Sequence, residues 1–433
     1  MEILSLGEKV KRRRKELNMT LKDLAGDRIT PGQISLVETG KSNPSMDLLE
    51  YLASSLNVSV EYLMESEEHQ AEMICEYYEN IAESYILNSD MNSAEKYIEI
   101  SSYYAEKYNI EYRKGKSLYL RAQIHIYREE YALAQQLLLS ANVFFVKLNA
   151  FDNIVNTYLD LGKITYILKA YYSSNCYFQQ AEKVFMDNNV KDDFKLAIIY
   201  YNIAMTFFKL DNVEKAMNYS FLSKEKFNAL DNKEQYAKSL MLLAEEYNKK
   251  GDISSAIKYS QSTLKILNEL NETNYVAEVE NSLGKLFYEF NNIEESFKHF
   301  NKAKEIRERN KDGKISETLV CLCENYLSIK DIDKCKDILK KILDNISDGD
   351  NFTIINYYLL KYRVHLMENN SKEAENTLHI AFNFAKNMEC YKNAAEIAIM
   401  IGKFYIDNGE DTMAAKYLNE GVELLKTAEI LKD

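Results

Sequence analysis

Apolar residues recur with a helical period along residues 73–433, and one motif is repeated within that pattern. A small residue on an apolar face is followed three positions later by an aromatic residue, and nine positions after that by alanine or a substitute. The first position of the motif recurs every 39 to 42 residues, at Ala82, Ala122, Gly162, Ala204, Ala244, Gly284, Cys323, Tyr362 and Gly402. The spacing predicts nine helical hairpins, each about 40 residues long.

Close packing explains the motif. A small residue on the first helix lets the second helix approach, and we expect the aromatic residue to fill the space toward the next hairpin. Asparagine and glycine pairs mark the turns between helices, at Asn188-Asn189, Asn291-Asn292, Asn369-Asn370 and Asn408-Gly409.

The first 64 residues follow a different pattern, in which short apolar stretches are separated by helix-capping residues. Leu6, Val10 and Leu17 recur at helical spacing and predict a first helix. The sequence from Thr20 to Asp23 is a capping box, which predicts that a short second helix begins there.

A third helix is expected from Thr30-Pro31-Gly32-Gln33, where Thr30 is the N-cap, Pro31 fills the first helical position and Gln33 reaches back to the cap. Gly40 is a natural stop for this helix. A fourth helix through Leu56 and a fifth that begins at Ser59 complete a five-helix head.

The segment between these two patterns is polar and acidic, with Glu65, Glu67 and Glu68. We therefore expect an all-α protein in three parts: a head at residues 1–64, an acidic hinge at 65–72 and a repeat body at 73–433.

The charge is divided unequally between head and body. Residues 1–64 hold nine basic and nine acidic residues, so the remaining 45 basic and 58 acidic residues carry the whole net charge of −13. Within the neutral head, six of the seven residues from Lys9 to Lys15 are basic. This run favours contact with phosphates, although a solvated helix face is the alternative. The acidic body should repel DNA.

Composition argues against several other classes of protein. No apolar stretch of 18 residues predicts a membrane span, and no apolar run follows the basic start, so we expect a cytoplasmic location and no membrane contact. The six cysteines and five histidines form no ligand spacing, and no catalytic motif is present. We therefore expect no enzyme activity, no metal and no cofactor.

The head resembles the helix-turn-helix domains of the Xre, Cro and lambda-repressor group. The resemblance rests on Leu6-Gly7-Glu8-Lys9-Val10, Arg14-Lys15, Met19-Thr20, Leu24-Ala25, Ile34-Ser35, Val37-Glu38, Gly40-Lys41, Asn43-Pro44-Ser45 and Leu56-Asn57-Val58-Ser59. It implies that the helix after Thr30 enters the major groove of a double-stranded operator. The DNA-contacting residues implied are Lys11, Arg14, Thr30, Pro31, Gly32, Gln33, Ser35, Lys41 and Asn43.

Gln33 is the best candidate base reader in this set, because its amide can pair with adenine through two hydrogen bonds. The alternative is that Gln33 only completes the helix cap. Arg14, Lys41 and Asn43 are expected near phosphates. Pro31-Gly32 replaces side chains that often contact bases, so DNA shape should supply more of the selectivity.

The body resembles tetratricopeptide repeats, lengthened beyond their usual 34 residues. A Xre-type head on such repeats resembles the peptide-sensing regulators of the Rap, Rgg, NprR, PlcR and PrgX group of Gram-positive bacteria. The resemblance implies a right-handed superhelix, a homodimer, and a transcription regulator that binds a short signalling peptide of the quorum-sensing type. Such regulators control processes that include sporulation and virulence.

If the resemblance holds, a peptide would lie against the first helices of the third to sixth hairpins. Groove positions are expected at the second, fifth, sixth, ninth and twelfth residues when the small residue is counted as the eighth. They include Asn156, Lys163, Tyr166, Tyr201, Asn202, Met205, Phe208, Lys238, Glu245, Asn248, Asn281, Lys285 and Tyr288. Asparagine can clamp a peptide backbone with a donor and an acceptor together. For each residue a solvated helix face is the alternative.

Two further expectations concern partners. The last helix carries Tyr417, Leu418, Val422, Leu424, Leu425, Ala428 and Leu431, more apolar surface than a free end should expose, so we expect dimerisation through the repeats. The alternative function is a scaffold whose repeats bind a partner protein, in the manner of Rap control of a phosphorelay, with DNA binding as a second activity.

Overall fold

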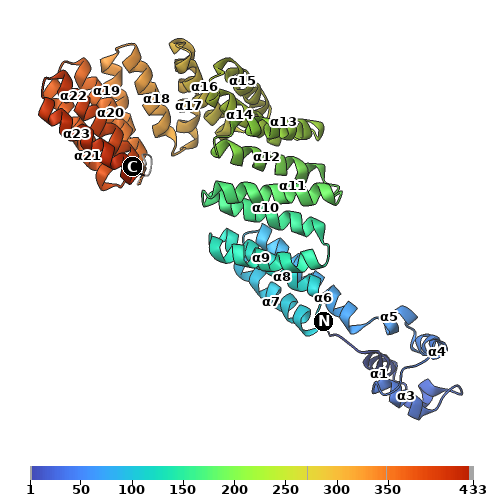
Figure 1. The fold of residues 1–433 in the computed structure, drawn as a ribbon. Helices are drawn as coiled ribbons and strands as arrows, with labels where there is room; N and C mark the ends of the chain where they lie inside the picture. The colour runs from blue at the N-terminus through green and yellow to red at the C-terminus, as the bar shows by residue number, and fades with distance from the viewer. Residues whose placement is uncertain (1, 271, 348, 429–433) are drawn as a thin grey trace. The chain divides into compact units, whose positions relative to one another are not determined.

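The protein is all-helical in its computed structural model, which describes residues 2–270, 272–347 and 349–428. The described residues form 23 α-helices (Figure 1), as the sequence predicts. None of these helices is long and apolar enough to cross a membrane. The chain divides into two compact units, Met1–Leu210 and Asp211–Asp433.

The first unit contains the head and the hairpins that follow it. The head comprises α1 (Leu6–Glu16), α2 (Leu21–Ala25), α3 (Pro31–Glu38), α4 (Met46–Leu56) and α5 (Val60–Met64). The hairpin helices of this unit are α6 (Glu67–Leu87), α7 (Met91–Lys107), α8 (Glu111–Tyr127), α9 (Tyr131–Lys147), α10 (Phe151–Ile167), α11 (Tyr171–Asp187) and α12 (Asp193–Lys209).

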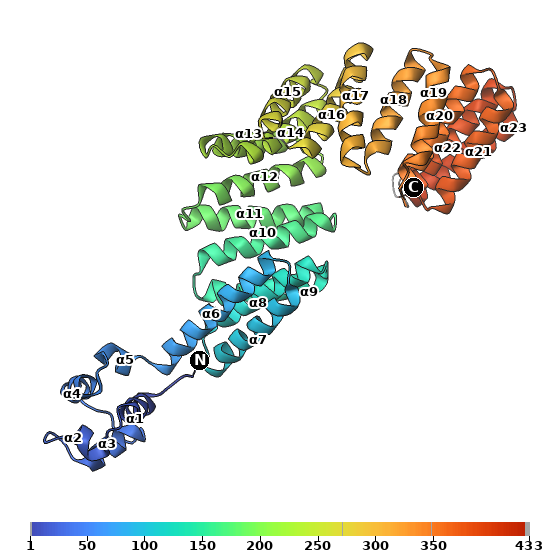
Figure 2. The same ribbon diagram turned by 180° about the vertical axis from the view of Figure 1, so that it is seen from behind.

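The second unit contains the remaining helices. They are α13 (Val213–Ala229), α14 (Lys233–Lys249), α15 (Ile253–Leu270), α16 (Thr273–Glu289), α17 (Ile293–Asn310), α18 (Ile315–Ser328), α19 (Ile332–Asp344), α20 (Asn351–Met367), α21 (Ser371–Asn387), α22 (Tyr391–Asp407) and α23 (Asp411–Thr427). Within the two units, eight of the nine predicted hairpins are formed by successive helices: α6/α7, α8/α9, α10/α11, α14/α15, α16/α17, α18/α19, α20/α21 and α22/α23. The boundary between the units falls between α12 and α13. Figure 2 shows the pairs α6/α7, α8/α9 and α10/α11 following one another within the first unit.

Local capping fixes the head helices at the predicted positions. Complete capping boxes open α1 at Ser5, α2 at Thr20 and α3 at Thr30. Apolar residues from all five helices meet in one core, which includes Val10, Leu24, Ile34, Leu52 and Leu63. The five predicted head helices are therefore confirmed.

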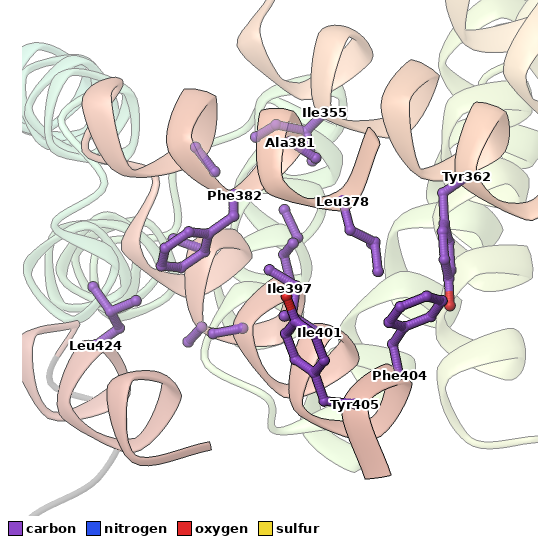
Figure 3. Close-up of a cluster of buried hydrophobic side chains, with 14 of the residues drawn as sticks. Ile355, Tyr362, Leu378, Ala381, Phe382, Ile397, Ile401, Phe404, Tyr405 and Leu424 are labelled. Atoms are coloured by element: carbon purple, nitrogen blue, oxygen red, sulfur yellow. The ribbon is translucent and has the colours of Figure 1, made fainter. Parts of the chain in front are cut away.

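Small residues bring the two helices of a hairpin together, as the motif predicts. A Cβ atom added at Gly162 on α10 would lie 2.4 Å from the ring of Phe178 on α11, and one at Gly284 on α16 would lie 2.5 Å from the ring of Phe300 on α17. Ser174 donates a 2.7 Å hydrogen bond to the carbonyl of Gly162 across the same contact. Figure 3 shows the apolar core of the last two hairpins, where Ile397 and Ile401 of α22 lie among side chains of α20 and α21.

The aromatic residue makes a contact that the motif did not predict in four hairpins. It stacks on the ring twelve positions later, in the second helix of its own hairpin. Tyr85 also packs on the core that contains Leu120 and Ile124 of the next hairpin, as predicted. The ring centroids lie 5.2 to 5.9 Å apart, in the pairs Tyr85–Tyr97, Tyr247–Tyr259, Phe287–His299 and Tyr405–Tyr417. The motif therefore also describes contacts within a single hairpin.

Left-handed backbone conformations occur at the predicted turns, with positive φ at Asn189, Asn291, Asn369 and Gly409. Asparagine and glycine tolerate this conformation at low cost. The expected hinge is shorter than predicted: Ser66 caps α6, so residues 67–72 form its first turns. Only Glu65 and Ser66 separate α5 from α6.

Candidate nucleic-acid interface and ligand pocket

The predicted recognition helix, α3, is packed closely against α1. Ile34 and Val37 are buried on its inner side, while Gly32, Gln33 and Ser35 are exposed. A Cβ atom at Gly7 of α1 would lie 2.5 Å from the carbonyl oxygen of Val37. The close approach at Gly7 fixes α3 on the head and leaves its opposite face exposed.

The geometry of Gln33 supports both hypotheses for this residue, base contact and helix capping. Its side-chain Oε1 accepts a 2.9 Å hydrogen bond from the Thr30 backbone amide, which completes the capping box. The side chain is also exposed at the first turn of α3. Base reading would require the amide to leave the cap or to use its NH₂ group, and it stays a prediction.

Arg14 is differently placed from what the sequence suggests. Its guanidinium donates to both carboxylate oxygens of Glu38 on α3, at 2.6 and 3.0 Å, and to the carbonyl of Met19 at 2.8 Å. The hydrogen bonds that Arg14 donates to Glu38 raise the pKa of Arg14, whose side chain is only 12% exposed. This corrects the expected phosphate contact, because Arg14 ties α1 to α3 inside the head.

The basic run of α1 is also partly internal. Lys9 is 1% exposed, and its Nζ donates to the carbonyls of Tyr62 and Glu65 at 2.7 and 2.8 Å. These carbonyls lie at the C-terminal end of α5, so Lys9 joins α1 to that end. Arg13 donates to the carbonyl of Leu56, at the end of α4.

The exposed cations of the run are Lys11, Arg12 and Lys15, and Arg12 pairs with Glu2 and Glu16. Lys41 and Asn43 are exposed in the turn after α3. The cations that remain available to phosphates are therefore fewer than the sequence suggests, and their placement on DNA stays a prediction.

The expected groove residues lie on the first helices of four hairpins, as predicted, but in two units. Those of the first unit, on α10 and α12, are Asn156, Lys163, Tyr166, Tyr201, Asn202, Met205 and Phe208. Of these, the Nδ2 of Asn202 donates to the carbonyl of Ile198 at 2.9 Å, within its own helix.

The expected groove positions on α10 include part of a buried polar cluster around Asp160. The carboxylate accepts hydrogen bonds from Tyr119 and Gln123 of α8, at 2.8 and 2.7 Å, and forms an ion pair with Lys163. Burial, together with the charge of Asp160, raises the pKa of Tyr119, which therefore remains a hydrogen-bond donor. Asp160 joins two successive first helices and was not singled out from the sequence.

In the second unit, three expected groove residues line one pocket. Its volume is about 120 Å³, and it is lined by Met241, Ala244, Glu245, Asn248, Ser260, Val279, Ser282, Lys285, Leu286 and Glu289. Glu245, Asn248 and Lys285 were expected, and Met241 and Ser282 occupy groove positions of the same spacing. Ser260 comes from the second helix α15, which the spacing could not indicate.

Two other expected residues of this unit are engaged elsewhere. Lys238 forms an ion pair with Glu234, at 2.6 Å, and lies over the ring of Tyr275. Asn281 is 4% exposed, and its Oδ1 accepts a 3.0 Å hydrogen bond from Thr318 of α18. The expectation that Asn281 faces a groove is wrong, because its side chain joins two hairpins. Tyr288 is half-buried on α16.

The last helix exposes less apolar surface than the sequence predicts. Leu424 is buried, and Tyr417 and Leu425 pack on the core of the last hairpins. Val422 remains 42% exposed, while Leu431 lies outside the described residues. This end of the body therefore offers little support for the expected dimer contact.

Comparisons with known proteins agree with this architecture. A family model described as helix-turn-helix matches residues 10–63. The transcriptional activator NprA of Geobacillus stearothermophilus is 19% identical over 406 residues, which cover 92% of this chain and 98% of NprA.

Two solved structures share the fold. The apo form of the quorum sensor NprR from B. thuringiensis matches with a TM-score of 0.61 at 13% identity, covering 83% of this chain and 100% of the chain in that structure. A Rap protein complexed with competence and sporulation factor matches with a TM-score of 0.52 at 13% identity, covering 84% of this chain and 100% of that chain.

The head and body together define a class: the chain is a helix-turn-helix regulator with a tetratricopeptide-like repeat body. It is similar to NprA in sequence and to NprR in fold over most of its length. The predicted resemblance to the Rap, Rgg, NprR, PlcR and PrgX group is thus confirmed.

Proposed function

We propose that the protein is a DNA-binding transcription regulator whose repeat body binds a short peptide and thereby controls operator binding. The match of residues 10–63 to a helix-turn-helix model and the similarity to a transcriptional activator support the first part. The fold shared with a quorum sensor supports the second.

The pocket between α14 and α16 carries the ligand-binding part of the proposal. Its apolar lining includes Met241 and Leu286, while Glu245, Asn248 and Lys285 supply charged and amide groups. This combination suits one peptide side chain with its adjoining backbone. The pocket has a volume of about 120 Å³ and is proposed to receive one anchor residue of the peptide.

In the head, the proposed base readers are Gln33 and Ser35. The residues proposed to contact phosphates are Lys11, Lys41 and Asn43. The start of α3, which would enter the groove first, is formed by Thr30, Pro31 and Gly32. Arg14 holds α3 in place through Glu38. One recognition helix reads few base pairs, so two heads on a double-stranded operator are proposed, as in other dimeric helix-turn-helix proteins.

The test begins with DNA selection. Full-length protein is mixed with fragmented genomic DNA from its source, and bound fragments are sequenced and confirmed by fluorescence anisotropy. The selected fragments should share a two-part site, and Lys41→Ala should lower affinity for all sequences and flatten the salt dependence. Binding without any sequence preference would contradict the regulator assignment.

Ligand binding is tested on the same operator. A library of synthetic short peptides is screened for a change in anisotropy, first with the unmodified protein and then with Lys285→Ala and Glu245→Ala. We expect an active peptide whose effect is weakened by either substitution, while ligand-free operator binding is retained. If both variants respond as fully as the parent, the pocket is not the binding site.

A further inference from the structure

Helix α9 presents apolar side chains to solvent along most of its length. Leu133, Leu139, Val143 and Val146 are 42%, 47%, 68% and 52% exposed. The opposite side of α9 forms its share of the hairpin core, in which the buried residues are Ala134, Leu138, Ala141 and Phe145. The exposed side chains are therefore not needed for the packing of their own hairpin.

These residues follow the spacing of a helix-pairing seam. Ala132, Gln136, Leu139, Val143 and Val146 are all exposed and succeed one another by alternating steps of four and three residues. The same alternation places side chains along one line of a helix so that a second helix can pack against them. Helices α8 and α10 already contact α9. The seam is thus open to one more helix.

The surface around this seam also lacks charge. Residues 131–146 contain no charged side chain, and neither do residues 171–181 of the neighbouring second helix α11, in a chain of which 28% is charged. By contrast, the preceding second helix, α7, exposes Lys96 and Glu99. An uncharged, apolar face of this extent is typical of a protein contact.

We propose that α9 is a self-association surface, on which α9 of a second copy packs antiparallel about a twofold axis. Each copy carries a net charge of −13, so two copies approach at least cost where charge is absent. A twofold contact sets this apolar face against itself and leaves no charge unpaired. Leu139 lies at the middle of the seam and would meet Leu139 of the partner subunit.

Other occupants fit the face less well. A partner that recognises charge finds none on residues 131–146. A membrane surface is bound by apolar helix faces flanked by basic residues, and this face has a single lysine, Lys147, at its end. The inference rests on the proposed function, because it names the contact that would pair the two heads. Self-association is measured without DNA or peptide, so the dimer contact and the proposed function can each fail independently of the other.

The experiment compares sedimentation of the full chain with that of a variant carrying Leu139→Glu and Val143→Glu. The unmodified chain should be a dimer at tens of micromolar. The variant should be a monomer at the same concentration, with a dimer dissociation constant at least about 100-fold higher than that of the unmodified chain. Val422→Glu on α23 is the matched control, because it charges another exposed apolar position and should leave the dimer intact. Circular dichroism verifies that each variant is folded.

A charge-swap pair keeps the result independent of folding. The Leu139→Lys, Val143→Lys chain should also be monomeric, and mixing it with the glutamate variant should restore a dimer. In a Cys176→Ser background, Leu139→Cys should form an intermolecular disulfide on oxidation, and the background chain should not. A monomeric unmodified chain overturns the proposal, as does a glutamate variant that remains dimeric or a mixture that stays monomeric.

Discussion

Gln70 on α6 makes two hydrogen bonds with the backbone of Leu4, in the segment before α1. Its Oε1 accepts from the Leu4 amide at 3.0 Å, and its Nε2 donates to the Leu4 carbonyl at 2.9 Å. Together with Lys9, which joins α1 to the end of α5, this side chain binds the head to the first helix of the body. The head therefore follows α6 closely instead of swinging on an acidic hinge.

Gln70→Ala should release this connection. The amide of Leu4 should lose protection in hydrogen exchange, and the free energy of unfolding should fall by about 1–2 kcal/mol for the two hydrogen bonds. Gln70→Glu keeps the acceptor for the Leu4 amide and loses the donor, so its effect should be intermediate. Unchanged exchange at Leu4 in the alanine variant would show that the contact is not formed in solution.

Gln33→Ala and Arg14→Ala should have different consequences for the head. Loss of a base contact at Gln33 should reduce discrimination between operator and scrambled DNA by about 1–3 kcal/mol. Loss of Arg14 leaves the carboxylate of Glu38 unpaired and should lower stability by about 1–3 kcal/mol. Thermal unfolding and DNA titration of each variant separate the two roles. A parental discrimination ratio in Gln33→Ala would leave this side chain only its capping role.

Gly284→Ala should destabilise the second unit, because the added Cβ atom would lie 2.5 Å from the ring of Phe300. Overpacking of this kind costs about 1–3 kcal/mol. Gly313→Ala is the control, since the nearest atom to its new Cβ, the Ser347 hydroxyl oxygen, lies at 3.7 Å. Urea unfolding should place the midpoint of Gly284→Ala well below that of the control, and equal midpoints would contradict the packing argument.

Glu246 should make stability depend on pH. Its side chain is fully buried, Oε1 accepts a 2.7 Å hydrogen bond from Ser220, and no hydrogen-bond partner for Oε2 is found among the described residues. Burial raises the pKa of Glu246 from 4.5 to about 8. The folded carboxyl thus stays protonated between these values while the unfolded one ionises, so stability falls as pH rises toward 8 and then levels off.

Glu246→Gln removes this dependence. The variant should be close to the parent at pH about 4.5 and more stable above pH about 8, with an upper limit of roughly 5 kcal/mol at about 1.4 kcal/mol per pKa unit. Urea unfolding at several pH values measures the difference, and Glu99→Gln, at an exposed residue of α7, is the control. A difference that does not grow with pH would mean that Glu246 is already ionised in the folded protein.

The helices and hairpins of the fold could be predicted from local sequence patterns. Capping boxes at Thr20 and Thr30 fix where helices begin, and recurring small residues fix which helices pair, because a Cβ atom at positions such as Gly162 would collide with the partner helix. Such signals depend on residues close in sequence or on a repeated spacing. That is why the helices and the hairpins could be predicted.

The candidate sites are less predictable because they depend on contacts between distant residues. A basic run gives no sign that Lys9 reaches residues 53 and 56 positions away, or that Arg14 pairs with Glu38. The spacing of the expected groove positions likewise predicted Glu245 and Lys285, which line the pocket. It could not show that the side chain of Asn281 is engaged in a hydrogen bond from Thr318. The apolar face of α9 was missed because its leucines and valines look like core in the sequence.

The short connection of Glu65 and Ser66 makes α6 a lever arm. This helix has 21 residues and is about 31 Å long, close to one turn of DNA at about 34 Å. With the head bound at its beginning, a tilt of α6 by about 10° against the hairpins displaces the head by roughly 5 Å. In the proposed dimer, a change of a few degrees in how the first hairpin packs would therefore change which operator spacing the two heads can reach together.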